Sequence, residues 1–214
     1  MFSLHEIDEK MLKYIDYENG FFIECGANDG ITQSNTAFLE KAKGWKGLLV
    51  EPGLENYKKC LANRPNSIVE NYALVSPNYK ENTIKGNFGS PHFNGLMNSV
   101  DVIPEYFDDE MKANAEDFKT KFKTNPVETN CCTLQSLLDK HNIQKVDFFS
   151  LDTEGYELEI LKGLNFSSVR PKYILIETTV SEHYTSLVNS FMSSAGYKHM
   201  ERLSINDSLY MDEK

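Results

Sequence analysis

Short hydrophobic runs alternate with amphipathic stretches along most of this chain. The hydrophobic runs are bounded by polar or turn residues, as buried parallel strands are, and the stretches between them place apolar residues at helical spacing. Together they predict an α/β fold, with a mostly parallel seven-stranded sheet and helices on both faces. The predicted strands are 21–25, 47–50, 67–75, 146–151, 173–176, 197–203 and 208–211.

Helix signals fall between these strands. Residues 4–17 carry apolar side chains at helical spacing and predict an N-terminal helix packed on the sheet. Ser34 or Asn35 can cap a helix that runs to about Lys43, and residues 54–63 predict the next helix. After the last helix, two strands joined by a short turn predict a C-terminal antiparallel hairpin.

The pattern loosens between about residues 76 and 130. Glycines and prolines interrupt short apolar pieces, and a polar, charged run follows. Long irregular insertions in a compact domain are usually lids or binding loops, and the aromatic and polar residues around His92 suit a sugar-binding surface. A surface loop without a ligand explains the same residues equally well. We expect one domain over residues 1–214, with this insertion on the side of the acceptor.

Composition narrows the class of protein. The chain has 214 residues, with 32 Asp and Glu against 22 Lys and Arg, and a formal net charge of −10. Nucleic-acid backbones and anionic membranes attract basic proteins, so neither is an expected partner. The 4 cysteines show no disulfide or zinc pattern, and no stretch resembles a signal peptide or membrane span. These features predict a cytoplasmic protein; the oligomeric state is not predicted.

The first candidate site is the loop after residues 21–25. Glu24 stands near the end of the strand, and Gly26 and Gly30 frame the turn that follows. Asn28 stands where a dinucleotide fingerprint has its second glycine, which disfavours a nicotinamide dehydrogenase because pyrophosphate needs close backbone approach. The pattern acid-x-Gly-x-x-x-Gly suits a ligand with a charged amino-acid end, such as S-adenosylmethionine.

The next two strands add further candidates. Glu51-Pro52 ends the second strand about twenty residues beyond the glycine loop, where an acid in doubly wound folds accepts hydrogen bonds from a ribose. A merely solvated strand-end acid is the alternative for Glu51. Asn71, near the end of the third strand, could approach an adenine or cap its own backbone.

A second acidic stretch follows residues 146–151. Asp152 and Glu154 lie two residues apart before a turn and a helix, so one of them should have a raised pKa and could take a proton from a hydroxyl. The alternatives are a helix cap and a divalent metal held by both acids, which is possible but not favoured. Glu177, after the fifth strand, could touch substrate or cap the segment that follows.

At this point the sequence resembles the FkbM-type methyltransferases, from Phe21 to about Glu177. The resemblance rests on three stretches in order: 22–30 (FIECGANDG), 45–52 (WKGLLVEP) and 146–161 (VDFFSLDTEGYELEIL). The last contains the family signature Asp-x-Glu-Gly-x-Glu. The family commonly has Asp at the end of its first strand, where this chain has Glu24.

This resemblance implies a class I methyltransferase Rossmann-like fold, S-adenosylmethionine as donor, and O-methylation of a hydroxyl on a small molecule or glycan. By position, Asp152 and Glu154 would face the acceptor, and Asp152 is the candidate base, with Glu154 or His92 as substitutes. A non-catalytic binding module that retains the fold is the alternative. The residues expected at the donor are Glu24, Gly26, Ala27, Asn28, Gly30, Glu51, Pro52 and Asn71; those expected at the acceptor are His92 and Glu177.

Overall fold

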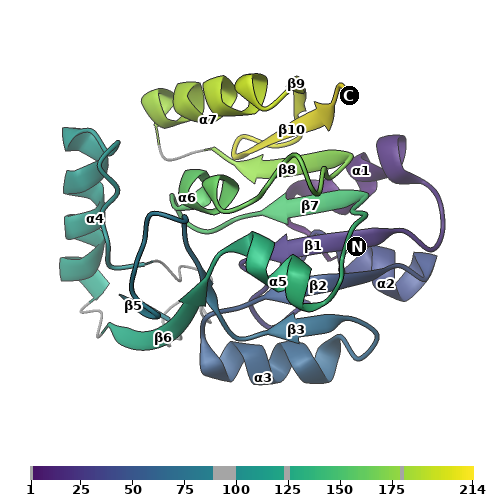
Figure 1. Ribbon diagram of the computed structural model, residues 1–214, viewed down its shortest axis with the longest axis horizontal. Coiled ribbons are helices and arrows are strands. Elements are labelled where there is room, and N and C mark those ends of the chain that lie inside the picture. The colour runs from purple at the N-terminus through teal and green to yellow at the C-terminus, as the bar shows by residue number, and fades with distance from the viewer. Residues whose placement is uncertain (1, 89–99, 123–125, 179–180) are drawn as a thin grey trace.

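Seven strands form the central sheet of this computed structural model, which describes residues 2–88, 100–122, 126–178 and 181–214. Their order is β3-β2-β1-β7-β8-β10-β9 (Figure 1). The strands are β1 (Phe21–Cys25), β2 (Lys46–Val50), β3 (Ile68–Glu70), β7 (Phe148–Leu151), β8 (Tyr173–Glu177), β9 (Tyr197–Arg202) and β10 (Asp207–Asp212).

Strands β3, β2, β1, β7 and β8 run parallel, and β10 is antiparallel to both of its neighbours. The chain leaves β1 toward β2 and β3 and returns on the other side through β7, so the strand order reverses between β1 and β7. Cys25 lies opposite both Val50 and Leu151 in the register. The loops after these strands therefore leave the sheet at one edge, where α/β folds bind ligands.

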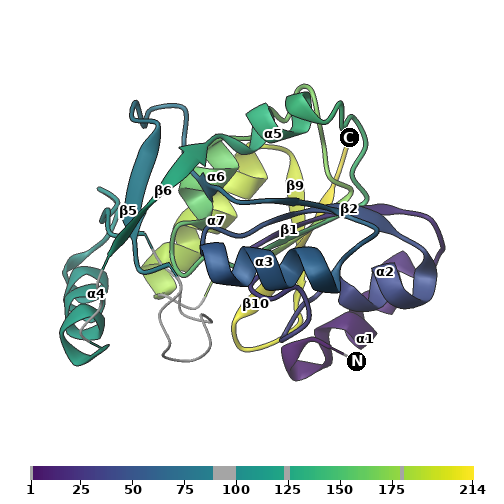
Figure 2. The same cartoon turned by 90° about the horizontal axis from the view of Figure 1, so that it is seen from below.

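Helices cover both faces of the sheet, as Figure 2 shows in side view. One face carries α1 (Ile7–Ile15), α2 (Ala37–Lys43) and α3 (Leu54–Asn63), and the other carries α5 (Leu134–Lys140), α6 (Glu157–Lys162) and α7 (Glu182–Ser194). Buried side chains form two separate clusters that correspond to these two faces. The predicted α/β fold with helices on both faces and a C-terminal antiparallel pair is therefore confirmed.

The N-terminal helix differs from its predicted span. A 3₁₀ turn, Leu4–Glu6, precedes α1, and His5 and Glu6 have left-handed backbone angles. The side chain of Asp8 accepts hydrogen bonds from the amide of Phe2 (2.7 Å) and the hydroxyl of Ser3 (2.7 Å). These contacts fold the first residues back along α1 and explain why regular helix starts only at residue 7.

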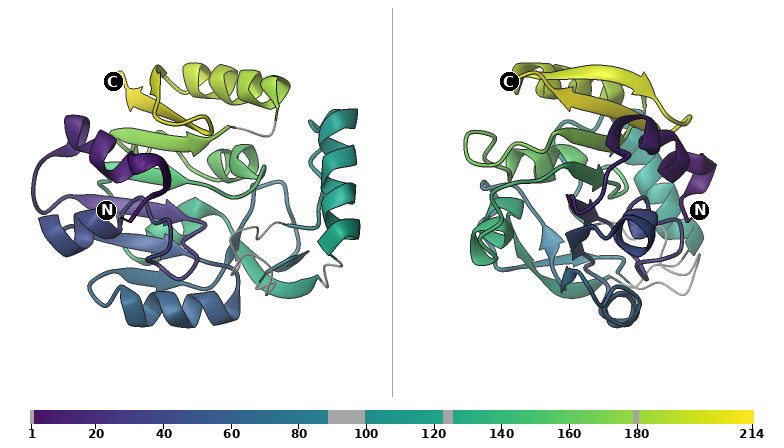
Figure 3. Two further views of the ribbon diagram at one scale, coloured as in Figure 1. Left: turned by 180° about the vertical axis from the view of Figure 1, so that it is seen from behind. Right: turned by 90° about the vertical axis from the view of Figure 1, so that its right-hand side faces the viewer.

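The insertion is more regular than its sequence predicts. It contains β5, a helix and most of β6, and with β4, which precedes it, these strands form a second, three-stranded sheet in the order β4-β6-β5. These elements lie beside the carboxyl edge of the main sheet (Figures 1 and 3). Their bounds are β4 (Ala73–Leu74), β5 (Thr83–Gly86), α4 (Asp109–Phe122) and β6 (Val127–Cys132).

The predicted strand 67–75 is therefore wrong as a single strand. Its first part, β3, pairs with β2, and its second part, β4, pairs with β6. Between them, the side-chain amide of Asn71 donates to the carbonyl oxygens of Glu51 (2.8 Å) and Pro52 (2.9 Å). These hydrogen bonds anchor the residues between β3 and β4, where the chain passes from one sheet to the other. No helix among the described residues is long and apolar enough to cross a membrane.

Candidate active site

A cavity of about 450 Å³ lies at the carboxyl edge of the sheet. It is lined by the loops after β1, β2 and β7, by the last residue of β8, by the insertion and by the N-terminal turn. This volume falls within the range of small-molecule and cofactor sites. The predicted residues in its lining are Glu24, Gly26, Ala27, Asn28, Glu51, Pro52, Asp152, Glu154 and Glu177.

The glycine loop packs directly against the loop after β7. Gly26 has φ +80°, and a Cβ placed on it would lie 1.9 Å from the carbonyl oxygen of Asp152. An L side chain would be strained by that backbone angle and would clash with that oxygen. Gly26 therefore allows the loops after β1 and β7 to meet at the floor of the cavity.

Asn28 carries an orphaned polar group at the cavity. Its backbone N–H donates to Oε2 of Glu51 (2.9 Å), and the second carboxylate oxygen of Glu51 accepts from the amide of Gly53 (2.7 Å). The side-chain oxygen and nitrogen of Asn28 are buried, and no hydrogen-bond partner for them lies in the described part of the chain. The residue is only 6% exposed. A buried amide without partners is costly, so this pair of atoms is suited to a polar ligand in the cavity.

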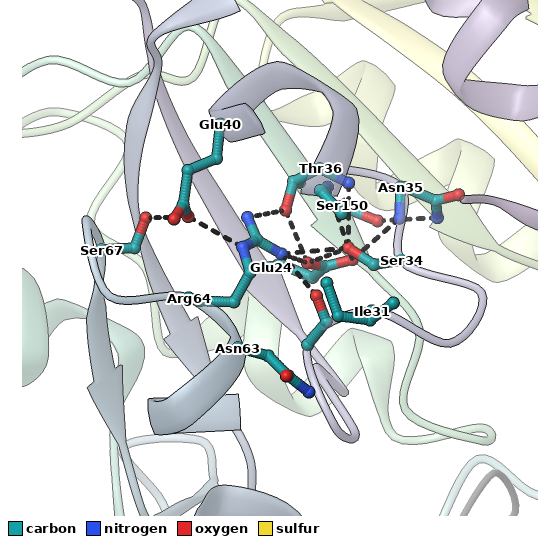
Figure 4. A network of polar contacts seen from close by, with 12 residues as sticks. Glu24, Ile31, Ser34, Asn35, Thr36, Glu40, Asn63, Arg64, Ser67 and Ser150 are labelled. Atoms are coloured by element: carbon teal, nitrogen blue, oxygen red, sulfur yellow. Dashed lines mark hydrogen bonds and ion pairs between the residues drawn. The ribbon is translucent and has the colours of Figure 1, made fainter. Parts of the chain in front are cut away.

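Glu24 is bonded chiefly to the protein itself (Figure 4). Its carboxylate accepts from the hydroxyls of Ser34 (2.8 Å) and Thr36 (2.6 Å) and from the amide of Asn35 (2.9 Å). It also pairs with the guanidinium of Arg64 at 3.4 Å. Glu24 therefore fixes the segment that leads into α2, and any contact with a ligand must be made beside these bonds.

Arg64, which follows α3, has no signal in the sequence that marks it as part of the site. It is fully buried and pairs with Glu40 (2.8 Å) as well as with Glu24. It also donates to the carbonyl oxygen of Gly30 (3.0 Å) and to the hydroxyl of Thr36 (2.9 Å). Arg64 thus holds the end of the glycine loop to α2 and α3 (Figure 4).

Two residues that were predicted to bind the methyl donor, Gly30 and Asn71, lie outside the lining of this cavity. The carbonyl oxygen of Gly30 accepts a hydrogen bond from Arg64. A Cβ on Gly30 would lie 2.8 Å from the Arg64 side chain and 2.9 Å from that of Cys60. Asn71 uses its amide to hold the chain after β2, and the neighbouring Tyr72 lines the cavity instead. Both residues therefore lie behind the wall of the cavity in this structure. For Asn71 this is the backbone contact that the sequence left as the alternative, and direct binding of the methyl donor by either residue stays a prediction.

Three acids lie together at the carboxyl ends of β7 and β8. Leu151 is opposite Ile176 in the register, so Asp152 and Glu177 follow at the same level. Desolvation, together with the charges of Glu157, Asp207 and Glu24, raises the pKa of Asp152 to about 7, although a hydrogen bond from Glu177 opposes this shift. Desolvation and the charge of Asp152 raise the pKa of Glu177 to about 11.

The pKa of Glu154 is also raised, first by desolvation and then by the charges of Asp152 and Glu157. One oxygen from each of Asp152, Glu154 and Glu177 lies within 4.8 Å of the others. That spacing would also suit a cation with oxygen ligands, so the metal interpretation of the sequence stays a hypothesis. All three acids line the same cavity, and they therefore face the same ligand space.

Several lining residues were not predicted from sequence. His5 and Leu4 come from the N-terminal turn, Asn206 comes from the β9–β10 connection, and Asp207 is the first residue of β10. None of them belongs to a recognisable motif, because only the folding of both chain ends over the sheet brings them to the cavity. The predicted acceptor residue His92 lies outside the described residues.

Comparisons with known proteins identify the family. The Methyltransferase FkbM domain matches residues 24–199. This chain belongs to the FkbM methyltransferase family. The match spans the glycine loop, the acidic stretch after β7 and the insertion, so the resemblance seen in the sequence is confirmed. No curated protein sequence matches the chain.

Several solved structures show low similarity to this chain. A SAM-dependent methyltransferase from Aquifex aeolicus is 11% identical, with 95% of this chain and 88% of that chain covered and a TM-score of 0.43. A methyltransferase from Pyrococcus furiosus is 17% identical, with coverage of 95% and 79% and a TM-score of 0.41. Fibrillarin from Aeropyrum pernix, solved with natively bound S-adenosyl-L-methionine, is 12% identical, with coverage of 91% and 66% and a TM-score of 0.40.

Proposed function

We propose that this FkbM methyltransferase transfers a methyl group from S-adenosylmethionine to a hydroxyl of a neutral sugar or glycan. The observation that carries the proposal is one cavity that joins the orphaned amide of Asn28 to the carboxyl groups of Asp152 and Glu177. The amide of Asn28 suits a polar methyl donor, and the carboxyl groups suit removal of a proton from an acceptor hydroxyl. Family membership supplies the methyl-transfer chemistry.

The donor would occupy the part of the cavity formed by the loops after β1 and β2. Asn28 offers both a hydrogen-bond donor and an acceptor to a ligand with an amino-acid end. Glu51, at the end of β2, has the position that binds a ribose diol in doubly wound folds. Bound S-adenosylmethionine supplies a methyl group that its sulfonium has already activated. The residues of the chain must therefore orient the acceptor and accept its proton.

Asp152 is the proposed base. Its pKa of about 7 lies near neutral pH, where a base is both ionised and able to hold a proton. Glu177, with a pKa of about 11, keeps its proton under these conditions and donates a hydrogen bond to Asp152. This bond holds the Asp152 carboxylate in one orientation. The proposal therefore gives Glu177 a role through Asp152, in addition to any contact with the acceptor.

The charge of the cavity argues for an uncharged acceptor. Its acidic lining residues are Glu24, Glu51, Asp152, Glu154, Glu177 and Asp207. Within the described ranges no Lys or Arg joins them in the lining, and His5 supplies the basic group. Glu177 keeps its proton, but the ionised members of this set carry negative charge. A phosphorylated or carboxylated acceptor would meet that like charge, which is unfavourable. Neutral hydroxyls can donate to these carboxylates, so a polyol fits the lining.

Two measurements test this function. Calorimetric titration with S-adenosylmethionine should show binding, and NAD in a parallel titration should not bind. Transfer of a radiolabelled methyl group should then be measured on a panel of neutral, amino and phosphorylated sugars, with label expected on neutral members and lost in Asp152→Asn. Donor binding without transfer to any acceptor would instead indicate a non-catalytic binding module.

A further inference from the structure

The turn that carries Asp152 and Glu154 is held in place from outside the cavity. It lies between β7 and α6 and contains Glu154 at φ +57° and Gly155 at φ +94°. Two consecutive left-handed residues, one of them not glycine, are unfavourable unless the surroundings fix them. The neighbouring groups that fix this turn therefore also determine where the two carboxyl groups point.

Glu157, the first residue of α6, makes most of the contacts that fix the turn. Its Oε1 accepts hydrogen bonds from the backbone amide of Thr153 (2.8 Å), the hydroxyl of Thr153 (3.1 Å) and the amide of Gly155 (3.2 Å). The side chain is fully buried, and it is absent from the cavity lining. Glu157 thus binds the residues on both sides of Glu154 and faces away from the ligand space.

Tyr184 of α7, on the same face of the sheet, completes this arrangement. Its hydroxyl donates a hydrogen bond to Oε2, the second carboxylate oxygen of Glu157, and Tyr184 is fully buried. Ser181 caps the start of α7 by accepting from the amide of Tyr184 (3.0 Å). The position of Glu157 is therefore set by the first turn of a long helix packed on the sheet.

Tyr106 connects the same turn to the insertion. It lies shortly before α4, stacks on Tyr184 with ring centroids 5.9 Å apart and planes at 23°, and its hydroxyl reaches the carbonyl oxygen of Gly155 at 3.4 Å. The ammonium group of Lys162 lies 5.2 Å from the centre of the Tyr106 ring. A displacement of the insertion would therefore be transmitted to the turn through Tyr106.

We propose that Glu157 and Tyr184 are positioning residues for methyl transfer, and that Tyr106 links this positioning to the insertion on the acceptor side. The proposal rests on the proposed function, because it assigns Asp152 and Glu154 to the acceptor. It goes beyond that function because it gives a role to Glu157, the last acid of the family signature, and to Tyr106 and Tyr184, which lie outside the motifs of the sequence. None of the three touches the reacting atoms; they act through the turn.

Tyr184→Phe tests the proposal, with Tyr210→Phe as its matched control. Tyr210 is also buried and also donates its hydroxyl to a residue of α7, Asn189 (2.8 Å), but it lies on β10 and does not contact the turn. Both variants lose one buried hydroxyl and its hydrogen bond. Tyr184→Phe should lower the melting temperature somewhat more than Tyr210→Phe, because its hydroxyl meets a carboxylate and not a neutral amide. Exchange at the turn is therefore compared with exchange of core amides in the same variant, which reports general stability.

Hydrogen–deuterium exchange gives a readout that needs no acceptor. The amides of Thr153 and Gly155 should exchange about tenfold faster in Tyr184→Phe than in the wild type, as expected for the loss of one hydrogen bond to a buried carboxylate. Tyr210→Phe should leave the exchange rates of these two amides unchanged. Tyr106→Leu, like Tyr184→Phe, should raise them. Equal exchange in Tyr184→Phe and Tyr210→Phe would overturn the proposal.

Kinetics then separate positioning from a purely structural role. With saturating donor and acceptor, Tyr184→Phe should lower kcat about tenfold while the Kd for S-adenosylmethionine stays within about twofold, because the donor loop is untouched. Glu157→Gln keeps an oxygen for the two backbone amides and should retain more activity than Glu157→Leu. A wild-type protein without methyl transfer would refute the proposed function and the role in catalysis with it, whereas the exchange comparison would still decide whether Tyr184 and Tyr106 hold the turn.

Discussion

Replacement of Arg64 by methionine should destabilise the protein strongly, because this single cation is shared by two buried carboxylates. Arg64 is fully buried between Glu24 and Glu40, which are 4% and 6% exposed. It forms ion pairs with both and donates to the carbonyl oxygen of Gly30. Methionine fills a similar volume but leaves two carboxylates and a carbonyl oxygen without this donor.

The loss in the free energy of unfolding follows from the burial of Arg64 and its two partners. Removing one partner of a buried ion pair typically costs about 3–5 kcal/mol, because the remaining charge is uncompensated. Here one cation serves two carboxylates, so we expect about 4 kcal/mol or more, against a total stability of about 5–15 kcal/mol for a domain of this kind. Arg64→Met should therefore unfold at a much lower urea concentration, or fail to fold at 37 °C.

Urea unfolding can be followed by the fluorescence of Trp45, the single tryptophan of the chain, which is 1% exposed. Lys58→Met, which removes an exposed ion pair with Glu55, is the control and should unfold at the wild-type midpoint. Arg64→Met combined with Glu40→Gln should recover part of the loss, since one of the two buried charges is gone. A loss of less than about 1 kcal/mol in Arg64→Met alone would refute the argument that this cation is required by its buried partners.

Three further predictions concern the cavity itself. Asn28→Ala should change the free energy of unfolding by less than about 1 kcal/mol, because its side chain has no partner in the described structure, but should raise the Kd for S-adenosylmethionine about tenfold in calorimetry. Gly26→Ala should abolish donor binding, since its Cβ would lie 1.9 Å from the Asp152 carbonyl oxygen; binding that survives would contradict the described packing. Asp152→Asn should lower kcat about 10²- to 10⁴-fold and remove an acid limb near pH 7. The pKa of Asp152 is raised to about 7 in the folded protein, from about 3.9 in the unfolded chain. This carboxyl group therefore contributes stability that is fully present below about pH 4 and lost as the pH rises through 7. The melting temperature of Asp152→Asn should accordingly exceed that of the wild type at pH 8 and match it at pH 4.

Local patterns were enough to predict most elements of the main sheet. The helix 54–63 is found at its predicted bounds, and Thr133 caps α5 by accepting from the amide of Ser136 (3.2 Å). The predicted end of the helix at about Lys43 is also found, and Gly44 follows it in the left-handed conformation. These outcomes depend on neighbours in sequence, since capping, glycine conformation and hydrophobic spacing act within a few residues.

The insertion and the chain ends could not be predicted in this way. Whether the stretch around Asn71 continues one strand or changes sheets depends on which edge is open for pairing, and β6, its second partner, lies more than fifty residues away. His5 and Asp207 reach the cavity only because both chain ends fold over the carboxyl edge of the sheet. Long-range contacts of this kind leave no periodic signal in the sequence.

The sequence by itself determined that acids end neighbouring strands, and parallel pairing brings the carboxyl ends of such strands to one edge. It therefore placed Glu51 and Asp152 at a common ligand site and identified the family. Only the tertiary structure decided how each acid is used: Glu24 is held by Arg64, Asp152 shares a hydrogen bond with Glu177, and Glu157 holds a turn. The physical reason is that the properties of a carboxylate depend on its burial and its partners, and distant parts of the chain supply both.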